Sequence, residues 1–263
     1  MSTIDQILYL APSGGDGDIR QAAASIRDRI ESERWQQRLE PWLRSGSPQG
    51  RGYMHFGSQA ALIRWRSDVT SPHGWQYALV LIGQPAVLTG SYALELPVLS
   101  AKLPILPNGG RLRPTTKTEP GPCYRAIEAE ARSQKAIDLL IPLLARVLAG
   151  ERSVTMPWTG PSLPEAVMWA LTSILSMLGD SRPVSFLTYM SGRAVTAPGR
   201  FVSFRPGAAS LPPDPGFETV ARNLATRFAD NPDGLRLTLL NQGVLASADH
   251  GDRLGRLLDL VPP

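Results

Sequence analysis

Four polar side chains of one predicted β-hairpin have the types and spacing of a binding surface: Tyr53, His55, Arg64 and Arg66. Successive residues of a strand point to opposite faces, so these four share one face when Met54, Phe56, Ile63 and Trp65 turn inward. Aromatic rings beside guanidinium groups suit stacking on bases and binding of phosphates, or binding of an acidic protein partner. A solvated face is the simpler interpretation of the same pattern, and a partner-binding surface is the next.

The stretch "APSGGDGDIRQA" is a second candidate, formed by Gly14, Gly15, Asp16, Gly17 and Asp18 between a predicted strand and a predicted helix. Backbone N–H groups of such a turn can bind an anion or a nucleotide. The two aspartates would repel an anion unless a cation lay between them. Asp18 as a helix N-cap explains the stretch without any ligand, so we favour a structural turn and keep a nucleotide site as the alternative.

Nucleophilic and metal chemistry find less support. The single Cys123 precedes a predicted helix, whose dipole can lower a thiol pKa, but no histidine is placed in a recognisable pattern beside it. One cysteine and three scattered histidines also leave few ligands for a structural zinc ion. The turn "WTGPSLP" lacks the lysine of a phosphate-binding loop, and its prolines suit the start of a helix. We predict no catalytic residue, no cofactor and no metal site.

The elements that position these residues begin with a strand in "TIDQILYLAP" and a helix from about Ile19 to Leu43. Three extended stretches follow, "GYMHF", "AALIRWRSDV" and "GWQYALVLIG", and their short connections favour an antiparallel meander. Period-two alternation also places Tyr77, Leu79 and Leu81 inward. This N-terminal α+β part covers residues 1–95.

The stretch from Leu96 to Pro122 is dense in Pro, Gly and Thr, which argues against a long helix or a central strand. We predict a linker over residues 96–122 and a C-terminal α/β part over residues 123–263.

The C-terminal part opens with a helical pattern from Tyr124 to Glu151, bent at Pro142. A β-α-β unit follows, with parallel strands "SVTMPW" and "PVSFLTYM" on either side of an apolar helix from Leu163 to Leu178. That helix is apolar nearly all round, which is typical of burial on several sides. A further strand, "RFVSF", and three short helices form the tail. The predicted fold class is therefore α/β, of mixed α and β structure.

Composition sets the broad class of the protein. Of the 263 residues, 43% are apolar and 19% charged, as in an ordinary globular protein. The formal net charge of +4 is a mild bias, so a dedicated nucleic-acid binder is less expected than a protein binder. The first residues show no basic stretch followed by a long apolar one, and we expect a cytoplasmic protein without membrane contact.

Two stretches resemble a known family: "WQYALVLIGQPAVLTGSYALEL", and "LLARVLAGERSVTMPW" through "EAVMWALTSILSMLGDSRPVSFLTYM". They are similar to the N-terminal and middle regions of the GTPase-associated adaptor proteins of actinobacteria, where a helix carrying a Trp precedes a strand that reads like "LSFxTY". Trp169 and the residues from Val184 to Tyr189 occupy those places here. The family pattern carries no catalytic residues.

The resemblance implies a non-enzymatic adaptor of a bacterial multi-component signalling or conflict (defence) system that binds a protein partner, such as a small GTPase. Two alternatives stay open from the residues alone. One is a nucleotide- or phosphoester-processing enzyme at the turn from Gly14 to Asp18, and the other is an RNA or single-stranded DNA binder that uses Tyr53, Arg64 and Arg66.

Overall fold

The structure is a computed structural model of the whole chain, and the residues described are 3–12, 18–45, 50–67, 75–97, 111–117, 121–160, 162–180, 182–190, 195, 197, 199–241 and 255–257. Its centre is a nine-stranded mixed sheet with the strand order β2-β1-β5-β4-β3-β8-β9-β7, and β6 pairs with β1. The mixed α/β class predicted from the sequence is confirmed.

The first half of the sheet is antiparallel. It contains β1 (Thr3–Pro12), β2 (Arg20–Ala24), β3 (Arg51–Phe56), β4 (Gln59–Ser67) and β5 (Trp75–Gly83). Strands β3, β4 and β5 form the predicted meander, because β4 pairs antiparallel with both of its sequence neighbours. The short β6 (Thr115–Thr116) lies inside the predicted linker and pairs with Thr3 and Ile4 of β1.

The second half of the sheet is parallel. Strand β9 (Arg200–Arg205) lies between β7 (Ser153–Pro157) and β8 (Val184–Leu187) and runs parallel to both. The β-α-β unit is thus confirmed, with β9 inserted between its two strands. The two halves join where β3 pairs antiparallel with β8, through Gly52 with Leu187 and Tyr53 with Phe186. One sheet spans residues of both predicted parts. The division of the chain into two domains at residues 96–122 stays a prediction.

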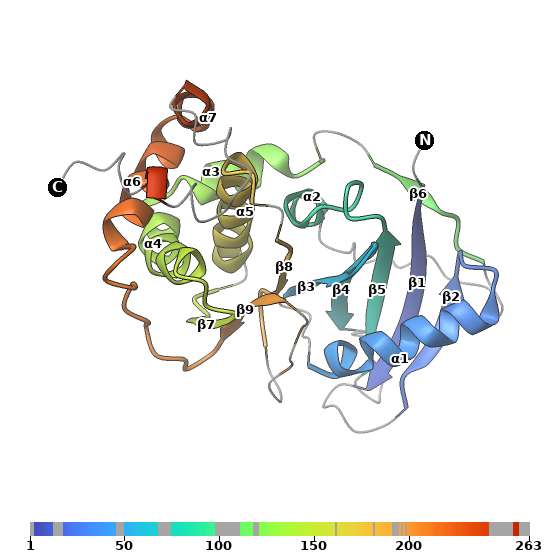
Figure 1. Cartoon of the computed structure of the whole chain (residues 1–263). Coiled ribbons are helices and arrows are strands. Elements are labelled where there is room, and N and C mark those ends of the chain that lie inside the picture. Colours follow the sequence, from blue (N-terminus) through green and yellow to red (C-terminus); the bar gives the residue numbers. More distant parts are fainter. Residues whose placement is uncertain are drawn as a thin grey trace.

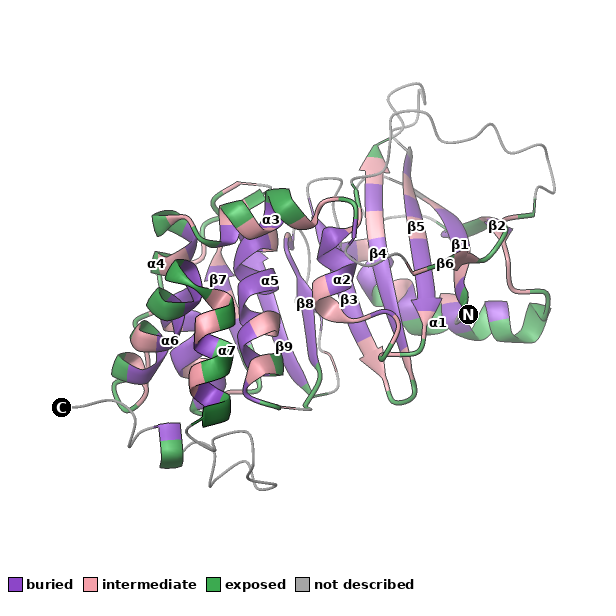
Figure 2. Ribbon diagram, turned by 90° about the horizontal axis from the view of Figure 1, so that it is seen from above, coloured by how far each residue is buried: buried purple, intermediate pink, exposed green. Residues whose placement is uncertain are grey.

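Helices cover both faces of the sheet (Figure 1, Figure 2). One face carries α1 (Arg29–Ser45), whose Trp35, Leu39, Trp42 and Leu43 pack on apolar residues of β1, β3, β4 and β5. The other face carries the remaining described helices, which share one apolar core: α2 (Gly90–Glu95), α3 (Tyr124–Ala131), α4 (Gln134–Leu148), α5 (Ser162–Met177), α6 (Glu218–Asp230) and α7 (Pro232–Asn241). As predicted, α5 is buried on several sides. Within the described chain, none of the helices is both long and apolar enough to cross a bilayer.

The predicted start of the first helix is wrong. Residues from Arg20 to Ala24 form β2 at the edge of the sheet, and the helix begins at Arg29. Its N-terminal cap is Asp28, whose Oδ1 accepts hydrogen bonds from the backbone N–H groups of Ile30 (2.8 Å) and Glu31 (3.4 Å). Pairing with β1 overrides the high helix propensity of the alanines in β2.

The long predicted helix from Tyr124 to Glu151 is two helices, and the break lies before Pro142. Ser133 is the N-cap of α4, because its Oγ accepts a hydrogen bond from the Ala136 N–H at 3.3 Å. This cap places the break between α3 and α4. Pro142 lies inside α4. In this segment the N-cap serine marks where the helix is broken, and the proline does not.

Candidate functional site

Helices cover both faces of the meander formed by β3, β4 and β5. The face of the hairpin that was predicted to be exposed to solvent is therefore covered. Met54, Ile63 and Trp65 face α1, whereas Leu81 lies in the core on the opposite face together with Tyr53. The alternation within each strand is as predicted. The expectation that Leu79 and Leu81 point the same way as Met54 is wrong, since helices lie on both sides of the sheet.

Tyr53 is buried, with 3% of its surface exposed. Its hydroxyl donates a hydrogen bond to the Leu88 carbonyl oxygen at 2.8 Å, and its ring stacks on Phe186 with centroids 5.4 Å apart. Burial raises the pKa of its hydroxyl above the ordinary value. A ring held in this way is unavailable for stacking on a nucleic-acid base, which corrects the role predicted for it.

Arg64 and Arg66 are half-buried rather than exposed. Arg64 donates from Nη1 to the Pro97 carbonyl oxygen at 2.7 Å, and it stands opposite Arg51 in the pairing of β4 with β3. Burial, with a smaller contribution from Arg51, lowers the pKa of Arg64 to about 10. The register of β3 with β4 places all four predicted residues on the same face of the hairpin, but only Tyr53 and His55 line the pocket described below.

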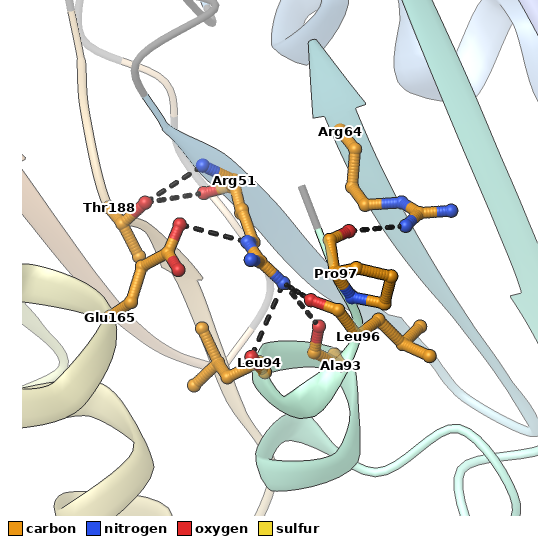
Figure 3. A network of polar contacts seen from close by, with 8 residues as sticks. All are labelled: Arg51, Arg64, Ala93, Leu94, Leu96, Pro97, Glu165 and Thr188. Carbon is orange, nitrogen blue, oxygen red and sulfur yellow. Dashed lines mark hydrogen bonds and ion pairs between the residues drawn. The ribbon is translucent and has the colours of Figure 1, made fainter. Parts of the chain in front are cut away.

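Arg51 organises the contact between α2, α5 and the sheet (Figure 3). Its Nη1 donates to the carbonyl oxygens of Ala93 (3.2 Å), Leu94 (3.3 Å) and Leu96 (2.5 Å), at the C-terminal end of α2. A cation at this end of a helix satisfies carbonyl groups that have no partner within the helix. Its Nε donates to Glu165 of α5 at 2.8 Å.

The buried carboxylate of Glu95 also secures α2. Glu95 accepts hydrogen bonds from Trp169 Nε1 at 3.0 Å and from the Gly121 backbone N–H at 2.9 Å. A Cβ at Gly121 would lie 2.5 Å from the Cβ of Glu95, so the close approach requires glycine. These contacts hold α2 against α5, and the two helices together form the walls of a pocket.

The pocket has a volume of about 530 Å³ and lies between β3, α2 and the C-terminal end of α5. Small and hydroxyl-bearing side chains dominate its lining, which includes Thr89, Gly90, Ser91, Thr172, Ser176 and Gly179. Thr89 caps α2, since its Oγ1 accepts a hydrogen bond from the Tyr92 N–H. A Cβ at Gly90 would come within 3.5 Å of the Tyr53 ring.

Asp180 and Arg182 form the charged end of the pocket. Helix α5 ends at Met177, and Gly179, with a φ of 64°, turns the chain so that Asp180 follows directly. The Asp180 side chain, 3% exposed, accepts hydrogen bonds from Arg182 Nε and Nη2 at 3.0 Å and from Arg200 Nη2 at 2.6 Å. Burial alone would raise the pKa of Asp180, but the hydrogen bonds from both arginines lower it to about 2.

His55 is a further titratable group of the lining, beside Tyr53. It is half-buried, its backbone N–H donates to Ser185 Oγ at 3.1 Å, and burial lowers the pKa of its imidazole. Near pH 7 this imidazole is therefore mostly neutral. Asp180 is a poor proton acceptor at that pH because its carboxylate is held by two guanidinium groups.

The other predicted candidates lie elsewhere. Gly14, Gly15, Asp16 and Gly17 fall outside the described residues, and Asp18 is exposed and precedes β2, so it caps no helix. Cys123 is half-buried immediately before α3, without a side-chain capping bond. Among the described residues, no group of three or more His, Cys, Asp or Glu side chains could hold a metal ion.

Sequence reasoning missed most of the pocket. The six-residue α2, Thr172, Ser176, Asp180 and Arg182 were not singled out. One signal was present: glycine followed by a charged residue after an apolar helix is typical of a helix end, and "LGDSR" has this form. That Asp180 would meet Arg200 could not be expected from local pattern.

Comparison of the chain with protein-family models, with curated proteins and with solved structures finds no match.

Proposed function

We propose that this chain is a non-enzymatic adaptor that binds a protein partner at the pocket between β3, α2 and α5. The proposed partner is a small GTPase of a bacterial signalling or conflict system, and the proposed setting is the cytoplasm. These finer statements rest on the family resemblance of two stretches of sequence.

The proposal rests on one observation: the two stretches of sequence that resemble the family line the same pocket. The first, from Trp75 to Leu96, supplies the pocket residues from Pro85 to Ser91, and the second, which ends at Met190, supplies those from Thr172 to Val184. Tyr53 and His55 are the lining residues that come from outside both stretches. Segments far apart in sequence that resemble one family therefore build the same pocket.

The chemistry of the lining supports a binding role. Its carboxylate is neutralised by arginines, its imidazole is mostly neutral, and its walls carry hydroxyl groups and small apolar side chains. Groups of this kind orient a ligand by hydrogen bonds and shape.

The alternatives receive less support. An RNA-binding role for Tyr53 conflicts with its burial and its hydrogen bond to Leu88. The nucleotide site at the turn from Gly14 to Asp18 falls almost wholly outside the described residues, and nothing in the described part of the chain adds to it.

The test is purification of the tagged protein from its native host at low salt, followed by assay of the eluate for GTP binding. Ser176 is exposed at the pocket, so Ser176→Trp should fill the pocket without disturbing the core, and the partner should be lost. Thr226→Trp, at an exposed position of α6, is the matched control and should retain the partner.

Two results separate the parts of this proposal. Recovery of the chain alone from the host, or equal retention of the partner by Ser176→Trp, would contradict the binding role of the pocket. Co-purification of a partner that binds no GTP would contradict the GTPase assignment and leave the adaptor role standing.

A further inference from the structure

Arg64 is a half-buried cation whose charge is not paired with a carboxylate of the described residues. Within that part of the chain, its hydrogen bond is the surface bond from Nη1 to the Pro97 carbonyl oxygen at 2.7 Å. The charged neighbour Arg51 has the same sign, and Arg51 is itself paired with Glu165. Arg64 therefore keeps a positive charge that its described surroundings do not compensate.

Two nitrogens of Arg64, Nε and Nη2, form a free edge of its guanidinium group. Nε is buried without a hydrogen-bond partner, and Nη2 donates to no acceptor among the residues that the structure describes. Figure 3 shows the group turned away from Arg51, with Nη1 on Pro97. Two N–H groups on one edge match the two oxygens of a carboxylate. A buried N–H without an acceptor is costly, so a carboxylate at this edge stabilises the arrangement.

Partial burial strengthens the attraction of Arg64 for an anion. Burial, and to a smaller extent Arg51, lowers the pKa of Arg64 to about 10, so the group stays protonated at neutral pH. A charge that is partly removed from water interacts more strongly with an opposite charge than a fully solvated one does. Arg64 thus differs from an ordinary surface arginine such as Arg29, whose side chain is 90% exposed.

Aliphatic side chains lie beside Arg64 on the same face of the sheet. Arg64 pairs in register with Leu79 of β5, and Leu79 pairs with Leu8 of β1. Leu10 follows Leu8 on the same face, because successive side chains of a strand alternate. Both Leu10 and Leu79 are half-buried. The surface beside the free edge is therefore apolar, which suits a ligand that carries apolar groups next to its anion.

Arg113 adds positive charge beside the same face. Gln6 of β1 donates from Nε2 to the Arg113 carbonyl oxygen at 2.6 Å. Gln6 and Leu62 both pair in register with Leu81, so two strand spacings, or about 10 Å, separate them, and Arg64 follows two residues after Leu62. Arg113 is exposed and forms no ion pair with a described residue. Salt screens a charge only in part over this distance.

We propose that this face binds an acidic segment of the protein partner, with a carboxylate on the Nε and Nη2 edge of Arg64 and an apolar side chain on Leu79. The inference rests on the proposed function, because the partner supplies the segment. The face is distinct from the pocket, whose lining does not include Arg64. The two surfaces lie at opposite ends of α2, the pocket at Thr89 and the free edge at Pro97, so one partner can contact both.

The aliphatic surroundings favour an acidic peptide over a nucleic acid. Binding of single-stranded nucleic acid uses a series of cations along the backbone and accessible rings on which bases stack. The rings closest to Arg64 on this face, Tyr53 and Tyr92, are 3% and 4% exposed. Leu79 offers contact to an apolar side chain, and the guanidinium edge offers contact to a carboxylate.

The experiment is a titration followed by nuclear magnetic resonance, with the Arg64 Nε–H signal and the backbone amides of residues 62–66 and 77–81 as readouts. The probes are an acetylated, amidated peptide of the order Gly-Glu-Leu-Glu-Gly, the same peptide with glutamine in place of glutamate, inorganic phosphate, and a single-stranded thymidine oligonucleotide. The glutamate peptide should shift these signals, and its affinity should fall as salt is raised. The glutamine peptide should leave them unchanged.

Variants identify the group responsible. Arg64→Gln should weaken binding of the glutamate peptide by about tenfold or more, because it removes a charge-assisted pair of hydrogen bonds. Arg64→Lys keeps the charge but lacks the fork, so it should recover only part of the affinity. Arg29→Gln, on α1 at the opposite face of the sheet, removes the same charge and is the matched control, which should bind as the unaltered protein does. Thermal denaturation verifies that each variant is folded.

Four results would overturn the inference. They are an unchanged Arg64 Nε–H signal in the unaltered protein, equal affinity in Arg64→Gln, the same shifts with phosphate alone at equal concentration, and tighter binding of the oligonucleotide than of the peptide. The third result would indicate a site for a free anion, and the fourth a nucleic-acid surface. The titration uses the protein without its native partner, so its failure is distinguishable from loss of the partner in Ser176→Trp, which tests the pocket.

Discussion

Arg51 and Glu165 form an ion pair between strand β3 and helix α5, with 2.8 Å between Arg51 Nε and Glu165 Oε1 and side chains that are 5% and 18% exposed. The same arginine binds the last carbonyl groups of α2. One side chain therefore fixes the positions of both helices that enclose the pocket. Burial raises the pKa of Glu165, and Arg51 opposes that rise.

Removal of Arg51 is expected to destabilise the protein more than removal of the charge on Glu165. Arg51→Met leaves a half-buried carboxylate and three carbonyl groups without their donor, and we expect a loss of about 3–5 kcal/mol in the free energy of unfolding. Glu165→Gln keeps an acceptor oxygen for Arg51 and should cost about 1–2 kcal/mol. Urea unfolding measures both values, and equal losses would contradict the role given to Arg51.

Asp180 is expected to make stability depend on pH in the acid range. Its pKa of about 2 in the folded protein lies below the value of about 3.9 for an unfolded chain. The unfolded state therefore binds more protons between these values, so the stabilisation is present above about pH 4 and is lost as pH falls toward 2.

The comparison is with Asp180→Asn, which should cost about 2–3 kcal/mol at pH 7, because the buried Arg200 loses its counter-charge. Urea unfolding at pH 7, 4 and 3 should show the difference between the two proteins shrinking as the pH falls. A constant difference across this range would contradict the assignment.

Gly52 is expected to tolerate no larger residue. A Cβ there would lie 2.9 Å from Leu187 Cδ2 and 2.9 Å from Trp65 Cη2, in a packed core. Gly52→Ala should therefore reduce stability by about 1–3 kcal/mol through overpacking. Gly83→Ala, whose Cβ would lie 3.4 Å or more from its neighbours, is the control and should change stability by less than about 1 kcal/mol.

The Tyr53 hydroxyl is expected to matter for stability. Tyr53→Phe leaves the buried Leu88 carbonyl oxygen without its donor, which should cost about 1–2 kcal/mol. Thermal or urea unfolding measures this loss. An unchanged stability, or a loss of affinity for a single-stranded RNA probe, would indicate that the hydroxyl faces solvent and a ligand instead.

Ser133→Ala tests the break between α3 and α4. The Ser133 hydroxyl caps α4 through the Ala136 N–H, and its removal should cost about 1 kcal/mol. Ser133→Asp supplies another N-cap acceptor and should retain most of the stability. A loss of the same size in both variants would argue against capping as the reason for the break.

Local signals predicted the elements that depend on neighbours in sequence. The meander follows from alternation and short turns, and the burial of α5 follows from its apolar residues. The error at β2 has the opposite origin, since a run of alanines favours a helix and only pairing with β1 makes it a strand.

The pocket could not be predicted for a related reason. The sequence indicated correctly that Tyr53 and Met54 point to opposite faces, but not that α2 and α5 cover the face of Tyr53. Asp180 and Arg200 come from different elements and meet only once the sheet has formed. Long-range pairings of this kind leave no periodic pattern in the sequence.

The pairing of β3 with β8 also has a consequence for how the chain folds. The hydrogen bond from the Arg51 N–H to Thr188 Oγ1 closes a loop across 137 positions of sequence, whereas the hairpin of β3 and β4 closes across a few. Closing long loops costs more chain entropy and slows folding. The antiparallel and parallel halves should therefore organise separately, and the docking of β8 on β3 should be the late, rate-limiting event.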